Sequence, residues 1–353
     1  MCITEMFGGT MKNPYSLVFG KEPAEHISRL AQFAMVMDSF NGTTDDQQIY
    51  LVTGIRGSGK TVFMTDIQNE LKKDSDWIVA EINPEKDILT AIAAKLSSED
   101  SLASLFKNAK INLSFWGLGL EVGGVAPITD IEVALSKMLH TIKKHNKKLL
   151  ITIDEVTNNR YVKEFAAAYQ ILIRQDLPVY LLMTGLFENV RNLQNEDSLT
   201  FLYRAPRIEL ESLNITSIAA NYSKNLKIDR DIAMEMAICT KGYSFAFQVL
   251  GYLTWENGGD YKEILPEYRQ YLDEFVYDKI WSELSIKDKT VLKAIAMTES
   301  GKIEKIREIL AMDSNEFNPY RKRLIDRGLI NGKERGYVRF ILPMFREYVI
   351  DNS

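Results

Sequence analysis

Cysteine and histidine are scarce in this chain of 353 residues, which holds two cysteines and three histidines. Cys2 and Cys239 are too few to form a disulfide framework, and no residues near them have the spacing of metal ligands. The scattered histidines disfavour zinc hydrolases and catalytic triads that depend on a histidine base. The remaining function classes are phosphate chemistry, ligand binding and scaffolding.

Long hydrophobic runs are also missing. The sequence has no stretch of about 18 apolar residues that would cross a membrane, and its first residues lack the basic start and apolar core of a signal peptide. Apolar residues make up 46% and charged residues 26%, which is ordinary for globular proteins. We therefore expect a soluble, cytoplasmic protein with no membrane partner, and the length predicts two or three domains.

Short β-rich runs alternate with stretches of helical periodicity up to about residue 210. This alternation predicts an α/β fold, with a parallel sheet and helices on both of its faces. The expected strands are residues 48–53, 77–82, 147–156, 178–185 and 205–210. Residues 111–127 are rich in β-formers and glycine, which predicts a hairpin inserted between helices.

The pattern changes beyond residue 210. Residues 212–275 have helical spacing throughout, and residues 281–353 predict three helices followed by two short strands. We therefore predict three domains, which are residues 1–210, 211–277 and 278–353.

A glycine-rich motif follows the first expected strand and precedes an amphipathic helix. Its pattern, GxxxxGK[ST], is formed by Gly54, Ile55, Arg56, Gly57, Ser58, Gly59, Lys60 and Thr61. In such a loop the glycines let the backbone wrap phosphates, and amides at the helix N-terminus point at the anion. Lys60 would meet the β- and γ-phosphates, and the Thr61 hydroxyl would bind Mg²⁺. The motif predicts a nucleotide site that extends to Val62; the alternative is a glycine turn that only caps a helix.

Two adjacent carboxylates, Asp154 and Glu155, end the apolar strand expected at residues 147–156. The carboxyl ends of parallel strands form the edge at which ligands bind. Asp154 would hold Mg²⁺, directly or through water, and Glu155 would polarise the attacking water. Such a pair alone is usually a solvated turn, but its combination with an upstream phosphate-binding loop predicts a catalytic pair.

Thr184 and Arg204 complete the candidate catalytic residues, with Lys60 and Glu155. Thr184 ends the strand expected at residues 178–185, where it either orients water and senses the γ-phosphate or caps the chain. Arg204 either stabilises charge on a γ-phosphate, in cis or in trans, or is a surface arginine.

These motifs, together with the tail segments LIDRGLI and GYVRFILPMFREYV, resemble the origin-recognition-complex-like AAA+ ATPases, and among them the archaeal-type ATPase family. The resemblance implies a P-loop NTPase of the AAA+ type with a helical lid and a C-terminal winged helix-turn-helix domain. It also implies ATP and ADP as ligands, Mg²⁺ as the metal and Thr184 as the first sensor.

Two departures from the family pattern bear on γ-phosphate sensing by the lid and on turnover, respectively. Replication initiators of this class carry a second-sensor arginine in the lid, and residues 241–245 (KGYSF) contain none. Thr184 stands where many relatives have asparagine. We therefore expect slow ATP hydrolysis.

The C-terminal region has the pattern of a winged helix, with helices expected at residues 303–310 and 314–328 and a glycine-bounded turn between two strands. Residues 281–353 hold 14 basic and 11 acidic side chains, whereas the whole chain has a net charge of −5. The residues expected to contact duplex DNA are Arg321, Lys322, Lys333 and Arg335.

Two functions therefore remain open. The first is an ATP-dependent switch that couples its nucleotide state to a DNA-binding winged helix. The second is a signalling or defence-type ATPase whose winged helix binds a protein or the chain's own ATPase domain, with a protein partner or a homo-oligomer as the expected assembly.

Overall fold

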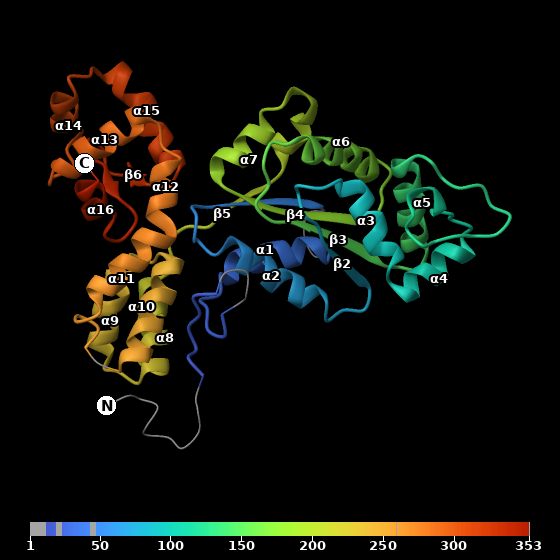
Figure 1. The fold of residues 1–353 in the computed structure, drawn as a ribbon, viewed down its shortest axis with the longest axis horizontal. Coiled ribbons are helices and arrows are strands. Elements are labelled where there is room, and N and C mark those ends of the chain that lie inside the picture. The colour runs from blue at the N-terminus through green and yellow to red at the C-terminus, as the bar shows by residue number, and fades with distance from the viewer. Residues whose placement is uncertain (1–11, 19–22, 43–46, 259, 353) are drawn as a thin grey trace. The chain divides into compact units, whose positions relative to one another are not determined.

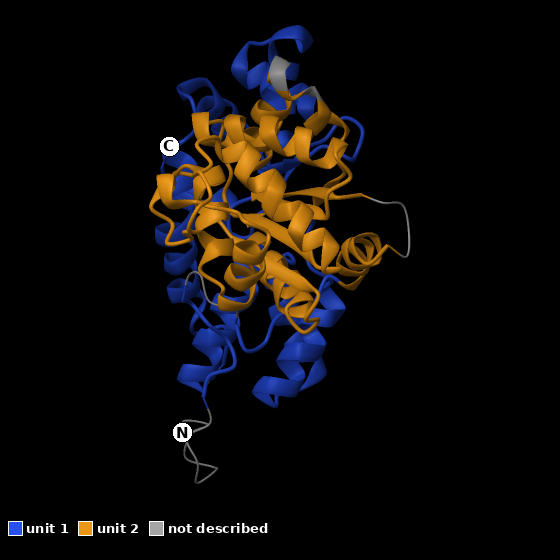
Figure 2. Ribbon diagram, turned by 90° about the vertical axis from the view of Figure 1, so that its right-hand side faces the viewer, with its two compact units in different colours: residues 1–29, 54–59, 210–353 blue, residues 30–53, 60–209 orange. Residues whose placement is uncertain are grey.

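The computed structural model describes residues 12–18, 23–42, 47–258 and 260–352, and Figure 1 gives their course. The chain divides into two compact units, which Figure 2 distinguishes by colour. We call residues 30–53 and 60–209 the sheet unit, and residues 1–29, 54–59 and 210–353 the helical unit. Our division at residues 210 and 277 remains a prediction. Among the described residues, no helix has the length and apolar character that a membrane crossing requires.

The sheet unit is built on a five-stranded parallel sheet with the order β2-β3-β4-β1-β5. Its strands are β1 (Ile49–Thr53), β2 (Trp77–Glu81), β3 (Lys148–Ile153), β4 (Val179–Gly185) and β5 (Arg207–Glu209). The central strands β1, β3 and β4 are buried along almost their whole length, as expected for a parallel sheet covered on both faces. The predicted α/β fold with a parallel sheet is confirmed. Because all strands run in one direction, their carboxyl ends meet at one edge.

Helices cover the sheet; Figure 1 draws α1 and α2 below the strands and α6 and α7 above them. The helices of this unit are α1 (Leu30–Phe40), α2 (Lys60–Leu71), α3 (Ile88–Ser97), α4 (Asp100–Asn108), α5 (Ile131–Lys144), α6 (Arg160–Arg174) and α7 (Phe187–Gln194). Side-chain caps fix where several of them begin. Asp130 accepts hydrogen bonds from two backbone amides at the start of α5, and Asn159 accepts one at the start of α6.

The prediction of a hairpin at residues 111–127 is wrong. This segment holds a short 3₁₀ turn, Ser114–Trp116, and no strand. The reason lies in Asn112, which is 3% exposed and donates its side-chain amide to the carbonyls of Val122 and Val125. These bonds occupy acceptors that a second strand would need for its ladder. Phe115, in the 3₁₀ turn, is 60% exposed.

The helical unit shares one hydrophobic core, which extends from Tyr15 to Val349. Its first helices, which we call the lid, are α8 (Ile215–Leu226), α9 (Arg230–Cys239), α10 (Ser244–Asn257) and α11 (Leu265–Leu272), and a π-helical turn (Asp273–Tyr277) follows. The helical structure predicted for residues 212–275 is confirmed.

The remaining elements, which we call the C-terminal module, include the predicted three helices and two strands, followed by a helix that was not predicted. They are α12 (Asp278–Ser282), α13 (Ile286–Met297), α14 (Ile303–Leu310), α15 (Ser314–Asp326), β6 (Ile330–Asn331), β7 (Arg339–Phe340) and α16 (Phe345–Asp351). Asp313 and Glu316 form a reciprocal capping box at the start of α15. β6 and β7 pair in antiparallel fashion, with Ile330 opposite Phe340. The two expected helices and the two short strands are present, and their assignment as a winged helix-turn-helix remains a prediction.

Candidate nucleotide site

The glycine-rich loop occupies the connection between β1, which ends at Thr53, and α2, which begins at Lys60. Gly57 and Gly59 have φ angles of 72° and 88°, in the region that favours glycine. Lys60, the first residue of α2, is 8% exposed. The loop therefore ends at a helix N-terminus, where free backbone amides attract phosphate.

A chain of hydrogen bonds joins the start of α2 to the ends of β3 and β4. The Thr61 hydroxyl donates to Asp154 Oδ2 at 2.7 Å, and the hydroxyl of the buried Thr184 donates to Asp154 Oδ1. Deeper in the unit, Gln68 Nε2 donates to Thr152 Oγ1 at 2.5 Å and fixes α2 against β3. The structure thus brings together Thr61, Asp154 and Thr184, as the sequence predicts.

Glu155, the other member of the acidic pair, has an unusual backbone. Its φ angle is 53°, which is uncommon for a residue other than glycine and costs about 1 kcal/mol. Its backbone amide donates to Asp154 Oδ1 at 3.0 Å and to Thr184 Oγ1 at 3.2 Å. Its side chain is exposed. The bonds of Asp154 and Thr184 therefore hold Glu155 in a strained turn, a type of feature that clusters at functional sites.

The oxygen atoms at this point fit a magnesium ion. Thr61 supplies a hydroxyl and Asp154 a carboxylate, which are the hard donors that Mg²⁺ prefers. No group of three or more metal-ligating side chains occurs in the described part of the chain. Phosphate oxygens and water would complete the coordination, as is usual where Mg²⁺ binds with a nucleotide. The bound ion would neutralise charge on the phosphates.

Family comparison identifies the domain that carries this site. Residues 42–200 match the model of a family described as an ATPase domain predominantly from Archaea. The matched region contains the glycine-rich loop, the acidic pair and Thr184. The chain is an ATPase. A second model, described as a domain of unknown function (DUF8462), matches residues 274–349.

Comparison with solved structures agrees with the family match of this ATPase. The Walker-type ATPase paby2304 of Pyrococcus abyssi is 16% identical, with a TM-score of 0.66 over 92% of this chain and 96% of that chain. The ORC2 protein of Aeropyrum pernix, in its ADPNP–ADP complexes, is 14% identical, with a TM-score of 0.61 over 95% of this chain and 96% of that chain. The fold is therefore that of the ORC-like P-loop AAA+ ATPases, which confirms the resemblance. A search of the curated proteins found no match.

Two other predicted site residues of the ATPase are Arg204 and Val62. Arg204 is exposed at the end of a 3₁₀ segment, Asp197–Arg204, and makes no hydrogen bond or ion pair with any described residue. Val62 is half-buried in the first turn of α2, directly after Thr61. Their roles remain predictions.

The sequence did not reveal the donors that contact the carbonyls of the loop. Arg29, Tyr243 and Ser244 each donate a side-chain hydrogen bond to a backbone carbonyl between Arg56 and Ser58. Burial lowers the pKa of the Arg29 guanidinium and raises the pKa of the Tyr243 phenol. No motif includes Arg29, and Tyr243 and Ser244 both lie in the arginine-free segment 241–245.

The four predicted DNA-contacting residues divide into two groups. Arg321 is half-buried and donates to the Gly332 carbonyl at 3.1 Å. Lys333 is exposed, and its Nζ atom lies 3.6 Å from Glu211 Oε1. Lys322 and Arg335 are exposed and make no hydrogen bond or ion pair with described residues. Only the second group therefore has cations that are both exposed and unengaged.

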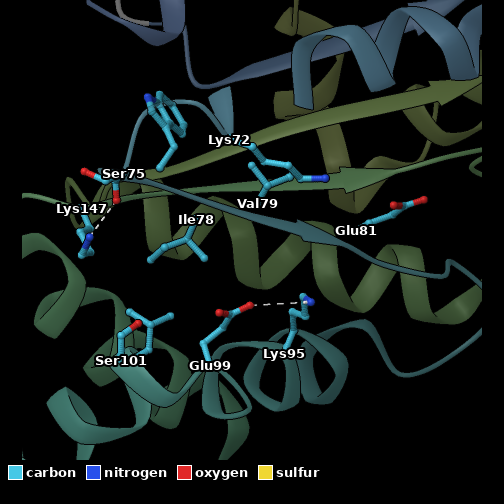
Figure 3. A pocket seen from close by; sticks show the side chains of 11 residues that line it. Lys72, Ser75, Ile78, Val79, Glu81, Lys95, Glu99, Ser101 and Lys147 are labelled. Carbon is cyan, nitrogen blue, oxygen red and sulfur yellow. Dashed lines mark hydrogen bonds and ion pairs between the residues drawn. The ribbon is translucent and has the colours of Figure 1, made fainter. Parts of the chain in front are cut away.

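A separate cavity of the ATPase, of about 660 Å³, lies along the outer edge of β2 (Figure 3). Three lysines contribute to its lining, but Lys95 lies 3.9 Å from Glu99, and Lys147 donates to the Ser75 carbonyl at 2.8 Å. It contains no residue of the loop or of the acidic pair. We assign no ligand to this cavity.

Proposed function

We propose that this ATPase binds ATP with Mg²⁺ at the glycine-rich loop, hydrolyses it slowly, and couples its nucleotide state to the C-terminal module. The observation that carries the proposal is the hydrogen-bonded group of Thr61, Asp154 and Thr184. It joins the residue after the phosphate-binding lysine to the ends of two neighbouring strands, where Mg²⁺ and the γ-phosphate would meet.

Each residue has a defined part in this proposal. Lys60 and the amides at the start of α2 bind the β- and γ-phosphates. Asp154 holds the metal, and its bond from Thr184 fixes the orientation of the carboxylate. Glu155 accepts a proton from the attacking water. Arg204, in cis or in trans, stabilises charge on the transferred phosphoryl group.

Support for coupling comes from contacts between the loop and the C-terminal module, both in the helical unit. A Cβ atom added to Gly328, in the turn after α15, would lie 2.1 Å from Ile55 Cγ2, so the two residues are closely packed. Arg56 lies 3.6 Å from Glu283, whose carbonyl also accepts a hydrogen bond from Arg327 at 3.4 Å. Two loop residues at positions that the motif leaves open thus touch the module, so a loop that closes on phosphate would shift these contacts.

Duplex DNA is the proposed ligand of the C-terminal module. Lys322 on α15 and Arg335 in the turn before β7 would contact phosphates, with Arg321 and Lys333 beside them. A second candidate is a protein partner or a second copy of the chain. It is favoured by the exposed Met297 and Ile309, which are 63% and 54% exposed and line a surface cavity of about 720 Å³.

The test of nucleotide binding is a thermal melt with and without ATP–Mg²⁺. Wild type is expected to melt at a higher temperature with the ligand, because a ligand at a hundred times its Kd stabilises by about 2.7 kcal/mol. Lys60→Ala is expected to lose the gain, whereas Lys72→Ala, which removes an exposed lysine just after α2, is expected to keep it. A wild-type protein that gains nothing from ATP–Mg²⁺ would contradict the proposal.

A further inference from the structure

Three consecutive carbonyl oxygens of the glycine-rich loop accept hydrogen bonds from the start of α10. The Tyr243 hydroxyl donates to the Arg56 carbonyl at 2.7 Å, and the Phe245 amide donates to the Gly57 carbonyl at 3.1 Å. The Ser244 hydroxyl donates to the Ser58 carbonyl at 3.0 Å. The loop backbone is therefore held at three successive peptide groups by one three-residue segment of the lid.

Two further features make this contact close. Arg29 Nη2 donates a second hydrogen bond to the Ser58 carbonyl, at 3.1 Å. A Cβ atom added to Gly57 would lie 2.2 Å from the Tyr243 hydroxyl oxygen, so glycine is required there for packing as well as for its positive φ. The loop and the lid segment therefore fit each other without room for a side chain at residue 57.

The hydrogen bonds to the loop carbonyls also determine the direction of the loop amides. In a trans peptide the C=O of one residue and the N–H of the next point in opposite directions, and the described residues contain no cis peptide bond. Bonds to the carbonyls of residues 56–58 therefore turn the amides of Gly57, Ser58 and Gly59 away from α10. The Ser58 amide already bonds to the Ile55 carbonyl at 3.2 Å. The amides of Gly57 and Gly59 are thus oriented for a phosphate on the opposite side.

We propose that the segment from Tyr243 to Phe245 is a clamp that preorganises the loop for phosphate, with Tyr243 and Ser244 as its positioning residues. This inference rests on the proposed nucleotide binding and adds how the lid takes part in it. The clamp acts on the loop backbone, not on the γ-phosphate. It should therefore support ATP and ADP equally, whereas a lid side chain that contacts the γ-phosphate would distinguish them.

Tyr243 offers a clean test because its hydroxyl can be removed without changing the shape of the ring. The residue is 4% exposed, and burial raises its pKa, so the phenol remains a protonated donor. Tyr222 is a matched control, because its hydroxyl donates to the Phe247 carbonyl, also at 2.7 Å, in the core of the lid. Tyr243→Phe and Tyr222→Phe each remove one such bond, but only the first bond reaches the loop.

The experiment measures the Kd of ADP–Mg²⁺ and ATP–Mg²⁺ by titration calorimetry, and the melting temperature without nucleotide. Both variants are expected to melt at a similarly reduced temperature. Only Tyr243→Phe is expected to weaken binding, by about tenfold for ADP and ATP alike, as the loss of one well-placed hydrogen bond implies. Ser244→Ala, which removes the bond to the Ser58 carbonyl, is expected to act in the same direction.

Two results would overturn the clamp. One is an equal Kd for Tyr243→Phe and Tyr222→Phe, which would make Tyr243 an ordinary core residue; Ser244→Ala decides the point if Tyr243→Phe does not fold. The other is a weakened Kd for ATP with an unchanged Kd for ADP, which would indicate contact with the γ-phosphate. Absence of binding by the wild type is a different result, because it removes the proposed function itself.

Discussion

Two polar clusters of this protein were predicted from residue type, and the structure uses them differently. At the carboxyl ends of β3 and β4, Asp154 bonds to Thr61 and Thr184, which are the partners that the motifs imply. In the C-terminal module, the predicted DNA-contacting residue Arg321 instead donates to the Gly332 carbonyl, and Arg323 on the same helix pairs with Asp288. The first cluster joins the start of α2 to the ends of two strands, whereas Arg321 and Arg323 stabilise the fold of the module.

The difference has a geometric cause. The carboxyl ends of parallel strands lie together at one edge of the sheet. The position of a residue at the end of its strand therefore determines which residues of the neighbouring strands lie beside it. A helix such as α15 has two faces, and a count of charges does not say which face each side chain takes. Asp288, only 1% exposed, draws Arg323 inward by bonds of 2.6 and 2.9 Å. Net charge therefore overstates the cationic surface of the module.

The largest expected effect concerns Glu155. If its carboxylate is the base that activates water, Glu155→Gln should lower ATP turnover by about a hundredfold or more and leave the Kd of ATP–Mg²⁺ nearly unchanged. Steady-state phosphate release and titration calorimetry measure the two quantities. Equal turnover in wild type and variant would remove Glu155 as the base and would leave the strained φ of this residue without a catalytic explanation.

The next effect tests the fold-stabilising role of the arginines in the module. Asp288→Ala leaves Arg323 without its buried partner and should lower the free energy of unfolding by about 2–3 kcal/mol, a figure reduced because Arg323 is 40% exposed. Chemical denaturation monitored in the C-terminal module measures the change.

Glu334→Ala is the matched control for Asp288→Ala, because it also removes a carboxylate that pairs with an arginine of this module, Arg339. Both side chains of that pair are more than half exposed, so the expected change is below about 0.5 kcal/mol. Similar losses in the two variants would contradict the distinction between buried and surface cations.

Most of the fold could be predicted because local signals and the overall arrangement agree. All five strands lie within the expected ranges, and the three central ones, β1, β3 and β4, are buried apolar runs. The failure at residues 111–127 occurs where a side chain competes with the backbone. Asn112 replaces the expected hairpin with a side-chain-bonded loop.

In the candidate site, too, some contacts could be predicted from the sequence and others could not. Thr61, Asp154 and Thr184 could be brought together from sequence, because each occupies a defined end of a helix or strand. Tyr243 and Ser244 could not, because they reach the loop from a segment almost 190 residues away that has no recognisable motif. The contact of Ile55 with the C-terminal module could not be predicted either, because the motif allows any residue at this position.

The smallest expected effect asks whether the exposed cations that remain suffice for DNA. Lys322→Ala with Arg335→Ala should weaken binding to duplex DNA and reduce the slope of log Kobs against log salt by about 2, because each lost phosphate contact releases about 0.9 fewer counterions. Fluorescence anisotropy across a salt series, with ATP–Mg²⁺ present, measures both. The control, Lys107→Ala with Lys144→Ala, removes two exposed lysines of the sheet unit and should leave the slope unchanged. If both pairs change the slope equally, the DNA responds to net charge and not to the module; if wild type does not bind duplex DNA at moderate salt, the exposed Met297 and Ile309 make a protein the preferred partner.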